Sequence, residues 1–358
     1  MAHILITPEE LGIPESIPLP ERNDWRIGIV GFGSIARGGH APSYKDVGWP
    51  IVAVADPDPN ARKEAGERYG IERIYSDYRE LVHDDEVEVI DLLTQPTLRE
   101  AVVQVTAEAG KPIITEKPFG TTIEECTRMV EITESAGTKL AVHQNYRWMK
   151  TNYLAYHIIK RGLIGEPFFA SIEIFGQQDV QLAGHPFYSS RHDFLTVQWD
   201  NHLADLLRYW TGKDAVRVFA RTGRMSGQNF AGDNLLVVVA DFGEGLTGHI
   251  LHSELLRSSL GGVQCRVDGD KGSLTFDFGS NLTLESSELG RETYMLNTSG
   301  LNFVSSFAGS MGAFLMALET DTEPMVSGRR NLSTIRTIMA EDKSAVAGGE
   351  WVHCSAIG

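Results

Sequence analysis

The chain has 358 residues, 42% of them hydrophobic and 22% charged, and is long enough for two domains with cores of their own. Its formal net charge of −16 argues against a surface that binds nucleic acid or an anionic membrane, and no apolar run is long enough to cross a bilayer. Cys126, Cys265 and Cys354 lack the spacing of a disulfide framework or a zinc site, so we expect no metal site and a reducing, cytoplasmic location.

The first 24 residues contain acids and four prolines, but neither a basic segment nor a long apolar segment. This composition does not fit a secretory signal. It fits an extended arm that lies on the chain itself or on a neighbouring subunit, and it also fits a disordered tail. The sequence leaves these alternatives open.

The next stretch has the pattern of a dinucleotide-binding turn. An apolar run at residues 26–30 predicts a buried parallel strand, and the residues after it predict a tight turn that opens a helix. That turn reads Gly31, Phe32, Gly33, Ser34, Ile35, Ala36. Gly31 permits the tight turn, Gly33 lets the backbone approach a pyrophosphate, and the helix N-terminus faces the phosphates. We therefore predict that residues 31–35 bind the cofactor.

A second apolar run, at residues 51–55, ends on Asp56. A carboxylate at this place can accept hydrogen bonds from the ribose hydroxyls of an adenosine, whereas a 2′-phosphate would meet a like charge. The sequence therefore predicts NAD rather than NADP. A chance glycine turn is the alternative, but strand, turn, helix start, second strand and acid all occur in the required order.

Strands and helices alternate up to residue 142, which predicts a doubly wound parallel sheet. The predicted helices cover residues 59–69, 78–82, 98–108 and 122–136, and the predicted strands cover 74–75, 87–93, 112–115 and 139–142. Ligands bind beyond the carboxyl ends of such strands. The residues expected there are Thr94, Gln95, Pro96, Glu116, Lys117, Pro118 and residues 143–147.

The pattern changes after residue 147. A helix at 152–160 is followed by runs with strand periodicity and Gly-rich turns, which predict a large, mainly antiparallel sheet. The expected strands cover residues 167–175, 216–221, 235–241, 247–252, 264–268, 273–278 and 281–285. Three further helices are expected: one that ends at Trp210, one at 303–318 and one at 331–347. The expected domains are an arm at 1–24, a Rossmann domain at 25–145 and an α+β domain at 146–358.

Several motifs together resemble those of the Gfo/Idh/MocA oxidoreductases. They are G-F-G-S-I-A, Asp56, T-Q-P-T-L-R, E-K-P, H-Q-N-Y-R-W and the later H-L-A-D, spread between residues 25 and 210. The resemblance implies hydride transfer between NAD(P) and a hydroxyl-bearing carbon of a sugar or cyclitol. It also implies a homodimer or homotetramer, which the alternating runs at 235–241 and 247–252 favour because they give the sheet an apolar face.

The resemblance also assigns roles to single residues. Lys117 is similar to the lysine that hydrogen-bonds the reacting oxygen and fixes the nicotinamide ribose, and His202 is similar to the acid/base of the family. A histidine suits that role because its pKa lies near working pH. Asn145 and Arg147 resemble a pair that lines the cofactor and substrate site, although Arg147 fits an interdomain ion pair equally well.

Gln198 departs from the family pattern, which often has an aspartate four residues before the histidine. On a regular helix Gln198 and His202 share a face, so we expect Gln198 to hydrogen-bond a substrate hydroxyl without supplying a negative charge. The departure keeps two other functions open. One is a glycoside-processing enzyme that uses tightly bound NAD for transient oxidation, and the other is a non-catalytic sugar or NAD sensor.

Overall fold

The computed structural model describes residues 4–298 and 302–358, so residues 1–3 of the expected arm lie outside the described residues. Contacts within the chain divide it into two units. One unit comprises residues 17–148 and 302–332, and the other comprises the described parts of 1–16, 149–301 and 333–358. Among the described residues, none of the helices combines the length and the apolar character that a bilayer crossing needs.

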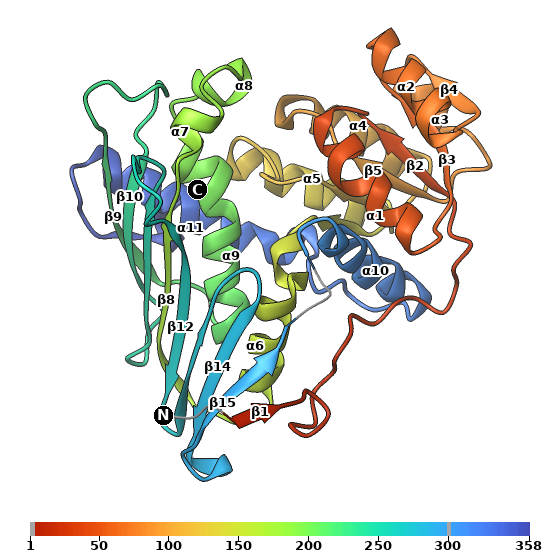
Figure 1. Cartoon of the computed structure of the whole chain (residues 1–358). Coiled ribbons are helices and arrows are strands. Elements are labelled where there is room, and N and C mark those ends of the chain that lie inside the picture. Colours follow the sequence, from red (N-terminus) through yellow and green to blue (C-terminus); the bar gives the residue numbers. More distant parts are fainter. Residues whose placement is uncertain (1–3, 299–301) are drawn as a thin grey trace. The chain divides into compact units, whose positions relative to one another are not determined.

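The first unit is built on a six-stranded parallel sheet (Figure 1). Its strands, in spatial order, are β4 (Arg73–Tyr75), β3 (Ile51–Ala55), β2 (Ile27–Val30), β5 (Val89–Leu92), β6 (Ile113–Thr115) and β7 (Leu140–Val142). The helices between them are α1 (Ala41–Asp46), α2 (Pro59–Tyr69), α3 (Tyr78–Val82), α4 (Pro96–Glu108) and α5 (Ile123–Ser135). The central strands are buried on both faces, which explains their continuous apolar sequence and confirms the doubly wound sheet.

Residues 302–332 belong to this first unit although they are distant in sequence. Helix α10 (Ser305–Glu319) packs against α1, and the backbone N–H of Ala308 donates to the Ser43 hydroxyl at 2.8 Å. A bridge also joins Ala141 to Ser327. This division differs from the expected domains, which are contiguous in sequence with boundaries after residues 24 and 145. Sequence patterns do not show that a helix late in the chain packs with the earlier parallel sheet.

The second unit is built on a ten-stranded mixed sheet. Its strands, in spatial order, are β1 (Ile4–Ile6), β15 (Thr293–Asn297), β14 (Asn281–Ser286), β13 (Gly272–Phe276), β12 (Gly262–Gly269), β8 (Pro167–Phe175), β11 (Thr247–Ser253), β10 (Leu235–Asp241), β9 (Arg217–Gly223) and β16 (Val352–His353). Strands β8 and β11 are parallel, as are β1 and β15, and the other pairs are antiparallel. The expected mainly antiparallel sheet is confirmed.

Helices cover one face of this sheet (Figure 1). They include α6 (Lys150–Lys160), α9 (Asp200–Thr211) and the part of α11 (Gly328–Val346) that begins at residue 333. Shorter helices, α7 (Gln178–Gln181) and α8 (Pro186–Ser189), follow β8.

The N-terminal segment lies on its own chain. Strand β1 pairs in parallel with β15, with Ile4 opposite Tyr294. Within the first unit, the backbone N–H groups of Glu21 and Arg22 donate to the Glu319 carboxylate, each at 2.9 Å. Backbone pairing of this kind orders a terminal segment, so the described part of the arm is held rather than free.

Candidate functional site

The turn after β2 has the geometry that a phosphate-binding turn requires. Gly31 has a φ of +94°, and a Cβ there would lie 3.0 Å from the carbonyl group of Leu93, so a side chain would be strained. Gly33 is exposed, and a Cβ on it would meet no heavy atom within 4 Å. The helix begins at Ser34, includes one π-helical turn from Ala36 to His40 and continues as α1. Open space above Gly33 therefore faces a helix N-terminus.

Asp56 follows β3 directly and contacts this turn. Its Oδ2 accepts a hydrogen bond from the backbone N–H of Phe32 at 2.6 Å, and its Oδ1 accepts one from the N–H of Asp58 at 2.8 Å. Each carboxylate oxygen has a second lone pair, so the side chain can still accept hydrogen bonds from ribose hydroxyls. The structure thus brings together Asp56 and the glycine turn, as the sequence predicts.

The segment after β5 also ends at this edge of the sheet. Thr94 is half-buried, Gln95 is exposed and Pro96 begins α4. The Thr94 Oγ1 atom is buried and has no hydrogen-bond partner among the described residues. A buried hydroxyl without a partner is costly, so this atom is suited to a bound ligand.

Arg99 joins this segment to the turn that carries Lys117. Its guanidinium donates to the carbonyl oxygen of Thr94 at 2.9 Å and to the carbonyl oxygens of Glu116 and Pro118. Burial lowers the pKa of Arg99 to about 10, and the side chain is only 2% exposed. The Lys117–Pro118 peptide bond is cis. Arg99 therefore holds two strand-end segments together from inside the unit.

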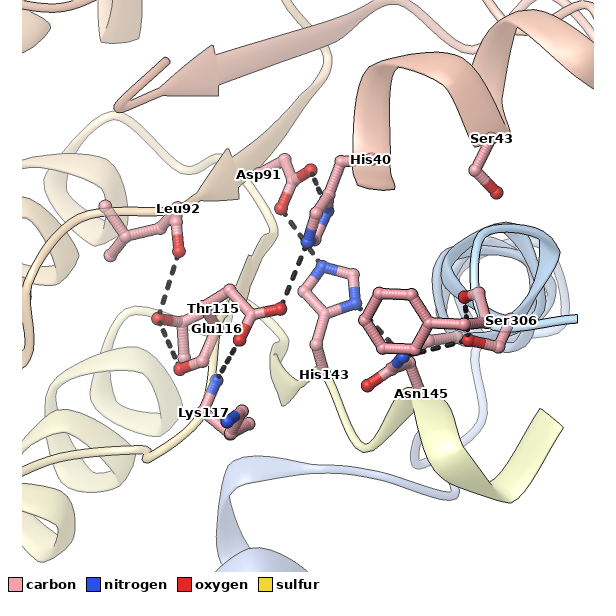
Figure 2. Close-up of polar contacts among 12 residues, drawn as sticks. His40, Ser43, Asp91, Leu92, Thr115, Glu116, Lys117, His143, Asn145 and Ser306 are labelled. Carbon is pink, nitrogen blue, oxygen red and sulfur yellow. Dashed lines mark hydrogen bonds and ion pairs between the residues drawn. The ribbon is translucent and has the colours of Figure 1, made fainter. Parts of the chain in front are cut away.

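Glu116 points into the unit (Figure 2). Its Oε2 accepts a hydrogen bond from the backbone N–H of Lys117 at 2.9 Å, and its Oε1 lies 3.0 Å from Nε2 of His40. Burial opposes the charge of this carboxylate, but the His40 side chain keeps the pKa of Glu116 below its usual range. Glu116 thus contacts the Lys117 turn and His40, and its predicted role in binding the cofactor stays a prediction.

His40 belongs to a larger buried network (Figure 2). Its Nδ1 lies 3.0 Å from Asp91 Oδ2, and His143 Nε2 lies 3.0 Å from Asp91 Oδ1. The Tyr44 hydroxyl donates to Asp91 at 2.8 Å. Burial opposes the charge on Asp91, but His40 and His143 hold the pKa of Asp91 well below its ordinary value. Asp91 is therefore an ionised acceptor of several hydrogen bonds.

His40, Asp91 and His143 have side chains of the types that bind metal ions. The possible ligand atoms of His40, Asp91 and His143 lie within 4.8 Å of one another. Hydrogen bonds among these residues already use those atoms, and the remaining Nδ1 of His143 lies 3.1 Å from the Ser310 hydroxyl. The arrangement is that of a satisfied hydrogen-bond network, which is the usual state of buried polar groups.

Sequence analysis did not identify His40, Tyr44, Asp91 or Arg99 as site residues. One signal was present, because Asp91 interrupts an apolar run that forms the buried strand β5. A carboxylate in such a strand needs partners, since an unpaired buried charge is unfavourable. The sequence does not say which partners these are.

Asn145 and Arg147 lie in a 3₁₀ turn after β7, and both are buried. The Asn145 amide donates to the Ser306 hydroxyl at 2.8 Å, and an Arg147 guanidinium N–H donates to the carbonyl oxygen of Met325 at 3.4 Å. Lys117 is half-buried at the end of β6. The structure thus places Asn145, Arg147 and Lys117 after neighbouring strands of one sheet, as predicted.

Gln198 and His202 lie in the second unit, and both are buried. The expectation of a regular helix through both residues is wrong. Phe194–Trp199 forms π-helical turns, and α9 begins at Asp200. A π-helix has a wider turn than an α-helix, and the shared face of Gln198 and His202 stays a prediction. Asp200 between them is fully buried.

The residues of the first unit fit a dinucleotide. Gly33 leaves room for a pyrophosphate, Asp56 retains acceptor capacity for a ribose, and Thr94 has a buried hydroxyl without a partner. All three follow strands at the carboxyl edge of a parallel sheet, where such ligands bind.

Comparisons with known proteins agree with this assignment. Residues 25–144 match the model of the Gfo/Idh/MocA oxidoreductase family with an NAD-binding Rossmann fold, and residues 154–275 match the model of the family's C-terminal domain. The chain is 27% identical over 332 residues to D-apiose dehydrogenase of Paraburkholderia graminis, covering 89% of this chain and 87% of that protein. It is 27% identical over 264 residues to myo-inositol 2-dehydrogenase of Thermotoga maritima, covering 70% of this chain and 75% of that protein.

Solved structures show the same fold. An oxidoreductase of Agrobacterium radiobacter, in complex with NAD⁺, L-tartaric acid and magnesium, is 25% identical and superposes with a TM-score of 0.86 over 94% of this chain and 100% of that one. A levoglucosan dehydrogenase in complex with NADH and levoglucosan is 19% identical, with a TM-score of 0.81 over 92% of this chain and 99% of that one. At the latter identity the likeness concerns the fold alone.

Proposed function

Since the chain belongs to the Gfo/Idh/MocA family of NAD-binding oxidoreductases, we propose that it oxidises a hydroxyl-bearing carbon of a sugar, sugar derivative or cyclitol. The observation that carries this proposal is the dinucleotide-binding edge, where Gly33, Asp56 and Thr94 follow neighbouring strands. The names of the relatives, which act on apiose and myo-inositol, support a polyhydroxylated substrate.

We propose that Lys117 and His202 divide the chemistry between them. Lys117 donates a hydrogen bond to the reacting hydroxyl oxygen and orients it. His202 accepts the hydroxyl proton while the C–H hydrogen leaves as hydride, so that a carbonyl group forms; a neutral imidazole can take up a proton in this way near neutral pH. NAD, when bound, supplies the hydride acceptor. Asn145 helps to bind the cofactor, and Arg147 and Gln198 contact the substrate.

Asp56 supports a preference for NAD over NADP. Its carboxylate already accepts two backbone hydrogen bonds, which fixes a negative charge beside the glycine turn. A 2′-phosphate would be repelled by that charge, whereas two ribose hydroxyls would donate to it.

A substrate panel tests the proposed function. D-apiose, myo-inositol, levoglucosan, other polyols and glycosides are each incubated with NAD or NADP, and the absorbance of reduced nicotinamide is followed. Steady formation of NADH with at least one free sugar or polyol is expected. Cleavage of a glycoside without net NADH would instead support the glycoside-processing function, and NAD binding without any reaction would support a sensor.

We further propose a homodimer or homotetramer that pairs through the outer face of the ten-stranded sheet. On this face Leu235, Val237, Val239 and Leu251 are half-buried, while the residues between them are fully buried. An apolar sheet face of this kind is suited to pairing with a second copy. Light scattering at micromolar concentration is the test, and a monomer would contradict the proposal. A cytoplasmic location is also proposed, since all three cysteines are free.

A further inference from the structure

We propose that His40, held as an imidazolium between Asp91 and Glu116, is a positioning residue that fixes the backbone at Lys117. The inference deepens the proposed function, on which it rests for the role of Lys117. Its geometry lies entirely within the first unit.

The first step concerns the protons of His40. Nδ1 lies 3.0 Å from a carboxylate oxygen of Asp91, and Nε2 lies 3.0 Å from a carboxylate oxygen of Glu116. A neutral imidazole has only one N–H donor. If that proton is on Nε2, Nδ1 can accept only by taking the Tyr44 hydroxyl proton, 3.1 Å away, from Asp91, and its lone pair then faces the Asp91 carboxylate. A doubly protonated ring donates to both carboxylates. His40 is fully buried, and although burial opposes the charged form, the two carboxylates raise the pKa of His40 to about 9.

The second step concerns the charges that face His40 from the surrounding elements. Asp91 at the end of β5 and Glu116 after β6 supply two negative charges. Burial lowers the pKa of His143 after β7, which favours its neutral form; in that form an Nε2–H donates to Asp91 and Nδ1 accepts from Ser310 on α10. Tyr44 on α1 donates its hydroxyl proton to Asp91.

Two further groups complete the surroundings of the network. The ring of Phe307 on α10 lies with its centroid 4.3 Å from that of His40 and adds no charge. The network therefore has a net charge of −1 when His40 is protonated, and the positive charge of Lys117 lowers the pKa of Glu116. Arg99 and Lys117 are cations beside Glu116, so a neutral His40 would chiefly remove the positive charge that faces the buried carboxylate of Asp91, which is unfavourable.

The third step connects this network to Lys117. Glu116 Oε1 lies 3.0 Å from His40 Nε2, and Glu116 Oε2 accepts a hydrogen bond from the backbone N–H of Lys117 at 2.9 Å. His40 in turn ends the helical turn that begins after Gly33. The imidazolium thus links the element that follows the cofactor-binding turn to the backbone of the residue that orients the substrate. Small displacements of such a residue lower turnover strongly.

The experiment uses the full-length protein, uniformly labelled with ¹⁵N, and the variants His40→Gln and Glu116→Gln. His83→Gln is the matched control, because His83 is an exposed histidine of the same unit whose ring lies at hydrogen-bond distance from the carbonyl oxygen of Arg79. Nuclear magnetic resonance records the protonation of His40 at about pH 8 and the hydrogen exchange of the Lys117 amide. Neither the protonation of His40 nor the exchange of the Lys117 amide requires a substrate to be measured. Elemental analysis of the purified protein is done in parallel.

We expect wild-type His40 to carry protons on both ring nitrogens at about pH 8. In His40→Gln and Glu116→Gln, the Lys117 amide should exchange at least about tenfold faster, because a hydrogen bond to a charged acceptor is weakened or lost. The turnover number with the fastest substrate should fall by about 10²-fold in His40→Gln, while the KM for NAD changes by less than about threefold. His83→Gln should match the wild type.

A neutral His40 at this pH would overturn the inference. So would unchanged exchange of the Lys117 amide in a folded His40→Gln variant, or a stoichiometric metal ion bound by His40, Asp91 and His143. If His40→Gln does not fold, the wild-type spectrum and Glu116→Gln decide. A wild type that oxidises no substrate would contradict the proposed function alone, since the spectrum and the exchange rates still test the role of His40.

Discussion

At the residue level, three carboxylates of the first unit accept hydrogen bonds from donors near the proposed site. Asp56 accepts a hydrogen bond from the backbone N–H of Phe32, and Glu116 accepts one from the backbone N–H of Lys117. Asp91 accepts one from the Tyr44 hydroxyl. Each carboxylate thereby fixes a backbone or side-chain position that the proposed reaction uses. Substitutions that remove charge but keep shape separate the electrostatic role of each residue from its packing.

The first prediction concerns Asp56→Asn. The amide keeps one acceptor oxygen but removes the negative charge, so the repulsion of a 2′-phosphate disappears. We expect the ratio of NADP to NAD affinity to rise by about tenfold, which corresponds to ~1.4 kcal/mol. Calorimetric titration of both cofactors measures it. Asp58→Asn, an exposed neighbour, is the control, and an unchanged ratio in Asp56→Asn would show that the carboxylate does not face the ribose.

The second prediction concerns the residues proposed to carry the chemistry. His202→Ala should lower the turnover number by about 10²–10⁴-fold, the usual effect of removing proton transfer, and Lys117→Ala should lower it by about 10²-fold or more, because the reacting oxygen is no longer oriented. NAD affinity should survive in His202→Ala. Lys63→Ala, at an exposed position on α2, should leave the rates unchanged. Turnover within a few-fold of wild type in both active-site variants would mean that these residues are not the reacting groups.

At the scale of elements, sequence patterns predicted the strands and helices well where periodicity and glycine signals coincide. Helix α2 begins and ends as predicted, because Pro59 starts it and Gly70 ends it with a φ of +69°. Strands β8 and β10 also have their predicted bounds. The short strands β1, β15 and β16 were not predicted, since their pairing depends on distant partners rather than on local pattern.

The site was predictable only in part for the same physical reason. The glycine turn and Asp56 are adjacent in a local motif, so spacing alone placed them together. The partners of Asp91 lie 47 to 52 residues away in sequence, and no local pattern indicates them. The π-helical turns before α9 were not predicted, because the sequence pattern there was interpreted with a helical period of 3.6.

A prediction at this scale concerns the glycine turn. Gly33→Ala should fold with unchanged stability, because its Cβ would meet no heavy atom within 4 Å and its φ is not positive. It should weaken NAD binding by at least about tenfold, because the methyl group occupies space that the pyrophosphate backbone contact needs. Melting temperature without cofactor and calorimetric affinity together measure both effects. Unchanged affinity would mean that the pyrophosphate binds elsewhere.

At the scale of the whole molecule, buried ionisable groups make stability depend on pH. In the second unit, the carboxyl groups of Glu341 on α11 and Asp200 on α9 are fully buried, and burial raises the pKa of both. Burial, with the neighbouring Asp200 charge, raises the pKa of Glu341 well above its ordinary value of 4.5. The folded state therefore retains a proton that the unfolded state releases, so stability falls as pH rises above about 4.5.

Glu341→Gln tests this linkage, because its amide can donate to Asp200 without titrating. Relative to wild type, the variant should gain stability as pH rises, by up to ~1.4 kcal/mol per pH unit. His40 also loses stabilisation between its ordinary pKa of 6.5 and about 9, but equally in both proteins. Urea unfolding at about pH 5 and about pH 8 measures the difference. If the stability difference between Glu341→Gln and the wild type does not change with pH, Glu341 carries no extra proton in the folded state.

Isotope transfer measures whether this chain moves a hydride from a hydroxyl-bearing carbon to NAD. The fastest substrate of the panel is prepared with deuterium on the carbon that carries the reacting hydroxyl, and the product nicotinamide is analysed by mass spectrometry. The account predicts that the NADH formed carries one deuterium on its nicotinamide ring. NADH without that deuterium, or oxidation with no NADH formed at all, would contradict it.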